Sequence, residues 1–376
     1  MNNDLIDNLK TPCHIVDIEK IKLNIESLLY IKNKTNAKIL FAIKGFSNDK
    51  ITPMFISSFD GVSASGLWEA RYGKELLKKT VHTYSSAYKK EDFSIINKYS
   101  DYIIFNSISQ LNAFTSEGNI NSQRLGIRIN PEYSEVKKYS INPCHQFSRF
   151  GVTRDKLSKL ELNNVSGLHF HSMCEQYEMT LDKTLSIVSN NFNEYLYQIN
   201  WLNIGGGQLY SDENYNLNQA VSSINFLQNK YNLDIFLEPC ETVVLNAGYT
   251  VASVVDIVHN GIASAILDLS AICHLPDIVN SPYRCEILNA SLPYEKEHTY
   301  RLTGCTCYAG DIFGDYSFDK PLEIGSKIVF LDTAAYSMVK NNYFNGMIPP
   351  YYAVLDSNKK INIVKEYNYK TFLSIL

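Results

Sequence analysis

The sequence lacks the patterns that mark membrane, exported and disulfide-rich proteins. No window approaches the roughly 20 consecutive apolar residues of a membrane-spanning helix. The N-terminus has no basic start followed by a long apolar core, so an export signal is not indicated. The eight cysteines include no CxxC pair, which argues against a disulfide framework and a paired zinc site. We therefore expect a cytoplasmic protein with reduced thiols and no membrane partner.

The sequence also lacks a large excess of charge of either sign. The formal net charge is -4, and 20% of the residues are charged. This balance argues against nucleic acid as the main partner and weakly favours a neutral or cationic small ligand. The 376 residues can bury one large core and a smaller one.

Short apolar runs alternate with helical patterns from residue 18 onward. Helical spacing of apolar residues is found in segments such as 18–29, 67–79, 108–116 and 179–199. Eight runs between and around these segments are strand candidates: 38–43, 59–62, 81–84, 102–105, 125–129, 167–171, 201–204 and 234–237. Eight strands with intervening helices predict an α/β fold of the (β/α)8 TIM barrel type. A doubly wound sheet is the alternative.

After about residue 246 the pattern changes to β-rich runs without long helices. The runs are 249–258, 263–269, 327–332, 351–355 and 360–364. Residues 13–17 form a further strand candidate ahead of the first barrel helix. We predict a barrel over 18–246, inserted into an all-β domain made of 1–17 and 247–376.

Several polar groups follow predicted barrel strands at the edge where such barrels carry their reactive groups. Lys44 ends the first strand, His171 ends the sixth, the glycines of 205–207 follow the seventh, and Glu238 follows the eighth. We therefore expect them around one mouth. A lysine there can form a Schiff base with a carbonyl cofactor, which also removes its charge. The simpler interpretation is a lysine whose head reaches water.

The other groups at this mouth suit a phosphate-bearing aromatic cofactor. Consecutive glycines can present backbone N–H groups to an anion, although a flexible turn explains them equally well. Glu238 would keep a pyridine nitrogen protonated, or would form an ordinary salt bridge. His169 and His171 share a strand face, but without a third ligand a metal site is not favoured. One imidazole stacked on a ring, with the other in the core, is the favoured interpretation.

A loop of the β domain, residues 304–311, holds the thiol of Cys307 and the carboxylate of Asp311. A turn with a buried cysteine is the simpler interpretation of this loop. Zinc at Cys305 and Cys307 is not expected, because further ligands are lacking.

In this order, the motifs resemble the fold type III pyridoxal-phosphate decarboxylases, the alanine racemase-like barrel group of ornithine and diaminopimelate decarboxylases. Within the group the sequence is most similar to the carboxynorspermidine (carboxyspermidine) decarboxylases, from about Pro12 to Gly346. Segments that carry the resemblance include "GVSASGLWEAR", "GLHFHSMCEQ", "WLNIGGG", "LNAGYTVASVVDIV", "CHLPD", "CYAGDIFGDYSFDKPLEIG" and "MVKNNYFNG".

The resemblance implies pyridoxal 5'-phosphate as the cofactor. Lys44 would be its Schiff-base lysine, His171 would stack on the ring, and Glu238 would pair with the ring nitrogen. The backbone of the glycines, helped by Tyr336, would hold the phosphate. The implied cofactor-binding set is Lys44, His171, Gly205, Gly206, Gly207, Glu238 and Tyr336.

The resemblance also implies residues for the substrate and for a partner subunit. Cys307 would be a catalytic thiol reaching into the partner's site, in a head-to-tail homodimer with shared active sites. Glu241 and Asp277 would bind the amines of a cationic polyamine-like substrate, with Asp311 as a further candidate. A cationic tail needs carboxylates where an acidic tail would need arginine.

Three residues depart from the family pattern: Cys240 replaces a glycine, Cys305 a proline, and Ala335 a histidine. The first matters most, since a Cβ at position 240 is expected to strain the turn that aims Glu238 and Glu241.

The implied reaction is decarboxylation of carboxynorspermidine or carboxyspermidine to norspermidine or spermidine, in polyamine biosynthesis. The two substrates differ by one methylene, typically worth only about 1–3 kcal/mol, so the residues do not rank them. The alternatives are a decarboxylase of the diaminopimelate or ornithine type, a racemase, and a non-catalytic pyridoxal-phosphate carrier. Racemases of this group favour arginine at the ring nitrogen, so Glu238 favours decarboxylation, and the thiol of the β domain disfavours a carrier.

Overall fold

The computed structural model describes residues 3–115, 124–158 and 165–376. The chain divides into two compact units. The barrel unit comprises residues 23–44 and 55–243, and the sheet unit comprises residues 1–22, 45–54 and 244–376. Residues 18–22, 45–54 and 244–246 therefore group with the sheet unit, although the sequence indicated the barrel for all three segments.

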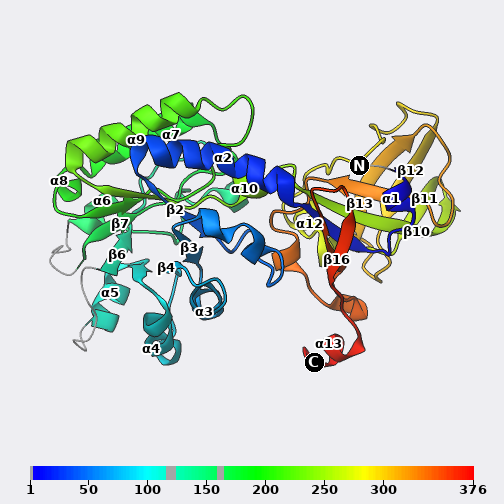
Figure 1. Ribbon diagram of the computed structural model, residues 1–376, viewed down its shortest axis with the longest axis horizontal. Helices are drawn as coiled ribbons and strands as arrows, with labels where there is room; N and C mark the ends of the chain where they lie inside the picture. The colour runs from blue at the N-terminus through cyan, green and yellow to red at the C-terminus, as the bar shows by residue number, and fades with distance from the viewer. Residues whose placement is uncertain (1–2, 116–123, 159–164) are drawn as a thin grey trace. The chain divides into compact units, whose positions relative to one another are not determined.

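The barrel unit contains the predicted closed parallel barrel, which excludes the doubly wound sheet (Figure 1). Its strands run in chain order around the barrel, and the last pairs with the first. They are β2 (Lys38–Ala42), β3 (Gly61–Ala64), β4 (Thr80–Tyr84), β5 (Tyr102–Phe105), β6 (Leu125–Arg128), β7 (Gly167–His169), β8 (Trp201–Asn203) and β9 (Asp234–Leu237). All eight predicted strands are confirmed, because strands covered by helices on the outside read as continuous apolar runs.

Helices cover the outside of the barrel strands. They are α2 (Ile18–Thr35), α3 (Leu67–Glu75), α4 (Lys90–Tyr99), α5 (Ile108–Thr115), α6 (Arg154–Leu157), α7 (Glu178–Asn191), α8 (Asn193–Leu196), α9 (Leu217–Tyr231) and α10 (Glu241–Val244). The helix predicted over 179–199 is two helices, because Phe192 has φ -119° and ψ 19°, outside the helical region.

A tryptophan fills part of the barrel interior. Trp201 packs with Leu40, Ile104 and Phe236. Its ring lies against glycines of the neighbouring strands: a Cβ on Gly167 would approach it to 2.0 Å. The interior is therefore a packed core, which leaves the strand ends as the place for chemistry.

The sheet unit is built on one mixed sheet. The strand order is β13–β12–β11–β10–β1–β15–β16, with β14 also pairing with β10. The strands are β1 (Cys13–Asp17), β10 (Gly248–Asn260), β11 (Ile262–Leu267), β12 (His298–Thr303), β13 (Ile312–Phe318), β14 (Lys327–Leu331), β15 (Tyr351–Leu355) and β16 (Ile361–Lys365). The prediction of β1 is confirmed, whereas β12 and β13 were not predicted.

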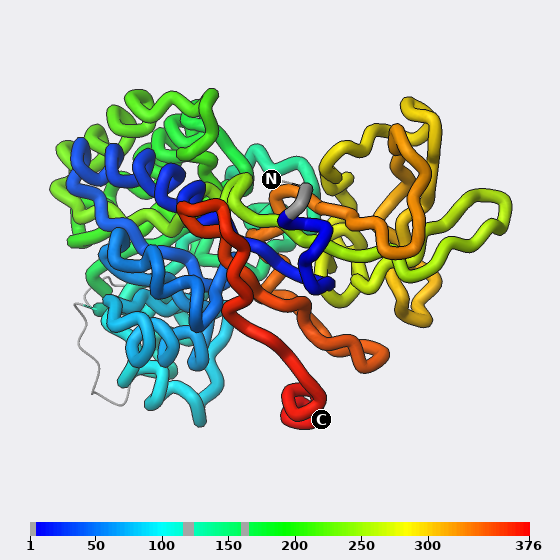
Figure 2. Tube along the Cα trace, turned by 45° about the vertical axis from the view of Figure 1, so that its right-hand side comes forward, coloured from blue at the N-terminus to red at the C-terminus, as the bar shows by residue number. Residues whose placement is uncertain are grey.

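The first strand of the chain lies between late ones. β1 pairs antiparallel with β10 and parallel with β15, so the blue start of the tube in Figure 2 runs beside its red end. The helices of this unit are short: α1 (Asn3–Asp7), α11 (Ala271–His274), α12 (Asp277–Asn280) and α13 (Tyr369–Leu373).

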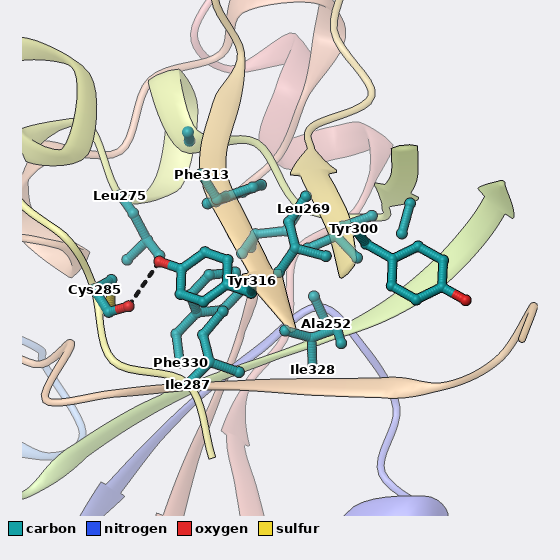
Figure 3. Packing of buried hydrophobic residues seen from close by; sticks show 14 of the residues in the cluster. Ala252, Leu269, Leu275, Cys285, Ile287, Tyr300, Phe313, Tyr316, Ile328 and Phe330 are labelled. Atoms are coloured by element: carbon teal, nitrogen blue, oxygen red, sulfur yellow. Dashed lines mark hydrogen bonds between the residues drawn. The ribbon is translucent and has the colours of Figure 1, made fainter. Parts of the chain in front are cut away.

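The largest buried cluster of the sheet unit lies around β11, β12 and β13 (Figure 3). Its labelled members are Ala252, Leu269, Leu275, Cys285, Ile287, Tyr300, Phe313, Tyr316, Ile328 and Phe330. The hydroxyl of Tyr316 donates to the carbonyl of Cys285 at 2.7 Å, which satisfies a polar group inside this apolar cluster.

Candidate active site

Consecutive strands of the barrel deliver the predicted polar groups to one end. β7 pairs with β8, β8 with β9, and β9 with β2. Lys44 and His171 each lie two residues beyond their strands, the glycines begin two residues beyond β8, and Glu238 directly follows β9. Because the strands are parallel, these groups share the C-terminal mouth of the barrel.

Glu238 is held at this mouth by two neighbours. Its Oε1 accepts a hydrogen bond of 2.8 Å from Nδ2 of Asn203, and its Oε2 lies 3.5 Å from Nε2 of His169. Glu238 as a whole residue is only 9% exposed. Burial by itself would raise its pKa, but His169, the Lys44 ammonium and the Asn203 hydrogen bond hold the pKa of Glu238 well below its usual range. Glu238 is therefore an ionised carboxylate.

The two histidines of "HFH" occupy different environments. Burial lowers the pKa of His169, and the neighbouring Glu238 carboxylate opposes that shift. That ring stacks on Tyr84, with 5.2 Å between centroids. Burial, Lys44 and Arg128 lower the pKa of His171, and its Nδ1 accepts from the N–H of Gly206 at 3.3 Å. His171 is therefore a neutral flat ring at the mouth.

The glycine loop fits between backbones where no side chain could stand. A Cβ on Gly206 would lie 2.1 Å from the carbonyl oxygen of Glu238, and one on Gly207 would lie 2.1 Å from that of Met173. Gly207 also has a φ of +92°, which favours glycine. The N–H of Gly205 donates to Oδ1 of Asn203 at 2.9 Å. The same asparagine thus fixes both the loop and Glu238.

Glu241 and Cys240 lie just beyond Glu238, at the start of α10. Cys240 is buried and is not among the residues with positive φ, so its Cβ causes no left-handed strain. The strain expected from the sequence is therefore not found. Burial and the nearby Glu241 carboxylate raise the pKa of Cys174 to about 12, which keeps that thiol neutral beside the mouth.

The remaining predicted site residues belong to the sheet unit. Cys307 is exposed in the loop between β12 and β13, and its N–H donates to Oδ1 of Asn345 at 2.8 Å. Tyr336 has a φ of +57°, and its N–H donates to the carbonyl of Gly45, the residue after Lys44, at 2.7 Å. Both oxygens of Asp277 accept from Nζ of Lys340 at 2.7 Å.

Asp311 is turned into its own unit. It is 3% exposed, its Oδ1 accepts from the N–H of Ala271 at 2.7 Å, and its Oδ2 accepts from the hydroxyl of Thr306 at 2.7 Å. The carboxylate thereby fastens the Cys307 loop to the start of α11. These contacts support a positioning role rather than the substrate contact that the sequence suggested.

No cluster of three potential metal ligands occurs within residues 3–115, 124–158 and 165–376. Over the same described ranges, no helix combines the length and apolar character needed to cross a membrane.

Comparison with known proteins identifies the family. Residues 30–334 match the family model "pyridoxal-dependent decarboxylase, C-terminal sheet domain". A carboxynorspermidine/carboxyspermidine decarboxylase from Campylobacter jejuni is 38% identical over 97% of this chain and 98% of its own. The chain belongs to the pyridoxal-dependent decarboxylase family.

Other relatives of this decarboxylase agree. A carboxyaminopropylagmatine decarboxylase from Synechocystis sp. is 33% identical over 99% of this chain and 97% of its own. The crystal structure of carboxynorspermidine decarboxylase complexed with norspermidine, from Campylobacter jejuni, covers 96% of this chain and 98% of that chain at 37% identity, with a TM-score of 0.89. A diaminopimelate decarboxylase structure from Helicobacter pylori, 18% identical with a TM-score of 0.83, shares the fold.

The decarboxylase uses pyridoxal 5'-phosphate, and the mouth of the barrel fits this group. The ionised Glu238 suits a protonated ring nitrogen, and the neutral His171 suits a flat ring. The glycine loop carries no side chains, and a Cβ at these positions would clash with neighbouring backbone. Lys44, two residues beyond the end of β2, is exposed and carries a primary amine.

Three residues at the mouth were not assigned a role from the sequence: Asn203, Arg128 and Tyr84. Arg128 is 5% exposed, donates from Nη2 to the carbonyl of His171 at 3.1 Å, and lies 4.6 Å from the centre of the Tyr84 ring. Each of the three carries a polar group and is the last residue of its barrel strand, and that position was the available sequence signal for a role at the mouth. Buried polar groups require partners, so such a residue is expected to contact other polar groups there.

Asn203→Ala tests the support of Glu238. The change removes a donor to the carboxylate and an acceptor for Gly205, so we expect a loss of about 1–3 kcal/mol in unfolding free energy. We also expect weaker cofactor binding, because the pKa of Glu238 rises. Urea unfolding and spectroscopic cofactor titration measure the two effects. Asn190→Ala, on the exposed side of α7, should stay within about 0.5 kcal/mol. Equal unfolding free energies and equal cofactor binding in the two variants would contradict the support of Glu238 by Asn203.

Proposed function

We propose that this enzyme decarboxylates carboxynorspermidine or carboxyspermidine and releases norspermidine or spermidine, as a step of polyamine biosynthesis. The observation that carries the proposal is the similarity along nearly the whole chain to a carboxynorspermidine/carboxyspermidine decarboxylase. The solved relative that holds norspermidine supports it. The carboxylates of Glu241 and Asp277 agree with a cationic substrate, because an acidic substrate tail would require arginine or lysine.

The proposal gives each residue a task. Pyridoxal phosphate, when bound, supplies the electron sink for the electron pair left behind by the departing carboxylate. Lys44 would hold the cofactor through its Nζ and would give up that place to the α-amine of the substrate. Glu238 would keep a proton at the ring nitrogen, and His171 would lie against the ring and exclude water from it. The thiol of Cys307 gives a proton to Cα. The glycine loop would hold the phosphate, with Tyr336 as the further phosphate-binding residue that the resemblance implies.

A substrate panel tests the proposed function. Carbon dioxide release is measured from carboxynorspermidine, carboxyspermidine, carboxyaminopropylagmatine, meso-diaminopimelate and ornithine. We expect kcat/KM for the first two to exceed the values for diaminopimelate and ornithine by at least about 100-fold. Diaminopimelate carries a carboxylate in its side chain, and the single short ammonium of ornithine cannot pair with both Glu241 and Asp277. Preference for diaminopimelate or ornithine, or racemisation without carbon dioxide release, would overturn it. Carboxyaminopropylagmatine is included because of the relative named for it.

A cytoplasmic homodimer with shared active sites completes the proposal. If Cys307 acts in the partner's site, Lys44→Ala and Cys307→Ala subunits should complement each other, since a mixed dimer holds one intact site. Random mixing gives about half mixed dimers, and each has one working site of two, so about a quarter of wild-type activity should return. The variants are unfolded together, refolded with cofactor and assayed. Absence of recovery, with dimers present by size-exclusion chromatography, would refute shared sites.

A further inference from the structure

Lys340 makes an ion pair with the carboxylate that the proposed function assigns to the substrate. Its Nζ lies 2.7 Å from both oxygens of Asp277, and the two side chains are 41% and 32% exposed. The same Nζ lies 4.8 Å from the centre of the Tyr336 ring. The pair lies within the sheet unit, so it does not depend on the barrel.

The backbone on both sides of this pair is fixed. Asp277 begins α12, which directly follows α11. The segment that carries Lys340 is fastened to α11 by Asn342, whose N–H donates to the carbonyl of Cys273 at 3.1 Å and whose Nδ2 donates to that of Ile272 at 2.7 Å. The lysine is therefore presented to Asp277 by two anchored elements rather than by a freely moving segment.

The chemistry of the pair imitates the proposed substrate. A lysine side chain is a primary ammonium on a chain of methylenes, which also describes the end of a polyamine. An ammonium that reaches both carboxylate oxygens already neutralises the charge that would attract a cationic tail. Because the pair is partly exposed, it is weak enough to be displaced.

We propose that Lys340 competes internally with the substrate's terminal ammonium for Asp277 and so sets the affinity for the cationic tail. This inference rests on the proposed function, because it requires a cationic tail at Asp277. Substrate binding moves Nζ of Lys340 away from the carboxylate, and product release restores the pair. Lys340 is thus a specificity-determining residue, and it takes no part in bond breaking.

Lys340→Met tests the competition, because methionine keeps an apolar stem and removes the ammonium. We expect KM for carboxynorspermidine to fall about two- to fivefold with kcat unchanged, the size expected for removing a partly exposed ion pair. The matched control is Lys296→Met, which removes an ion pair of 2.7 Å with Asp319 elsewhere in the sheet unit and should leave KM unchanged. A merely structural lysine would raise KM or lower kcat, and either result, or an unchanged KM, would overturn the proposal.

A second comparison keeps the test independent of the variant's folding and distinguishes its failure from a failure of the proposed function. Asp277→Asn should raise KM more in the Lys340→Met background than in the wild type, because the competitor no longer masks the carboxylate. An equal rise in both backgrounds would also overturn the proposal. If the wild-type holoenzyme turns over neither carboxynorspermidine nor carboxyspermidine, the proposed function itself fails, and that failure is seen before any lysine variant is compared.

Discussion

Lys44→Ala is expected to lower kcat by at least about a thousandfold, the largest effect of any single substitution in this enzyme. The side chain lies at the mouth of the barrel with Glu238 and His171, and its charge acts on the pKa values of both. Without this amine, the proposed covalent attachment of the cofactor and its exchange with the substrate are both lost. Carbon dioxide release at saturating cofactor measures the effect.

A matched control for Lys44 lies on the same strand. Lys38 begins β2 at the opposite end of the barrel and pairs with Asp234 at 2.9 Å. Lys38→Ala should keep kcat within about twofold, because exposed ion pairs are weak. Borohydride reduction followed by peptide mass analysis should place the cofactor on Lys44 in the Lys38 variant and nowhere in the Lys44 variant. Cofactor trapped on another lysine in the wild type would refute the assignment.

Glu238→Gln is expected to give the second largest effect, a fall in kcat of about a hundredfold or more, since an amide cannot keep a proton on the ring nitrogen. The amide oxygen can still accept from Asn203, so the local fold should persist. Steady-state kinetics and the cofactor absorption spectrum measure the change. Glu194→Gln, an exposed residue of α8, serves as the matched control and should behave as wild type. Unchanged kcat in the Glu238 variant would contradict the role.

The pH dependence follows from the sign of the pKa shift at Glu238. A carboxyl group whose pKa lies below its usual range in the folded state stays ionised above the unfolded value, and it loses its charge only as the pH falls toward the folded value. Between about pH 5 and pH 8, protonation of Glu238 is therefore not expected to lower kcat, and a pH profile of kcat over this range checks it.

The barrel and the strand-end groups could be predicted because both depend on local pattern. Apolar runs precede Lys44, His171 and Glu238. Such a run predicts a buried strand whose end lies near the next polar residue, and this prediction does not require knowing which strands pair with it. The support of Glu238 by Asn203 could not be predicted in this way. It arises only when β8 pairs with β9, which is a property of the closed barrel.

The sheet unit shows why the other side-chain roles could not be derived locally. Asp311 was expected to face a substrate, but its direction is set by α11, about 40 residues earlier. The pairing of Asp277 with Lys340 joins residues 63 positions apart. Strand β12 alternates buried and partly exposed residues, so it has no continuous apolar run and was not predicted from the sequence. One of its polar residues, Arg301, pairs with Asp315 on β13.

The position of β1 has a consequence for how the chain acquires its structure during synthesis. β1 emerges first, yet its partners β10 and β15 begin at residues 248 and 351. The barrel strands, 38 through 237, are all translated before either partner exists. The ribosome therefore releases a segment that can close its barrel while strand β1 still has unpaired edges. Chaperones would have to protect those edges until the last strands arrive.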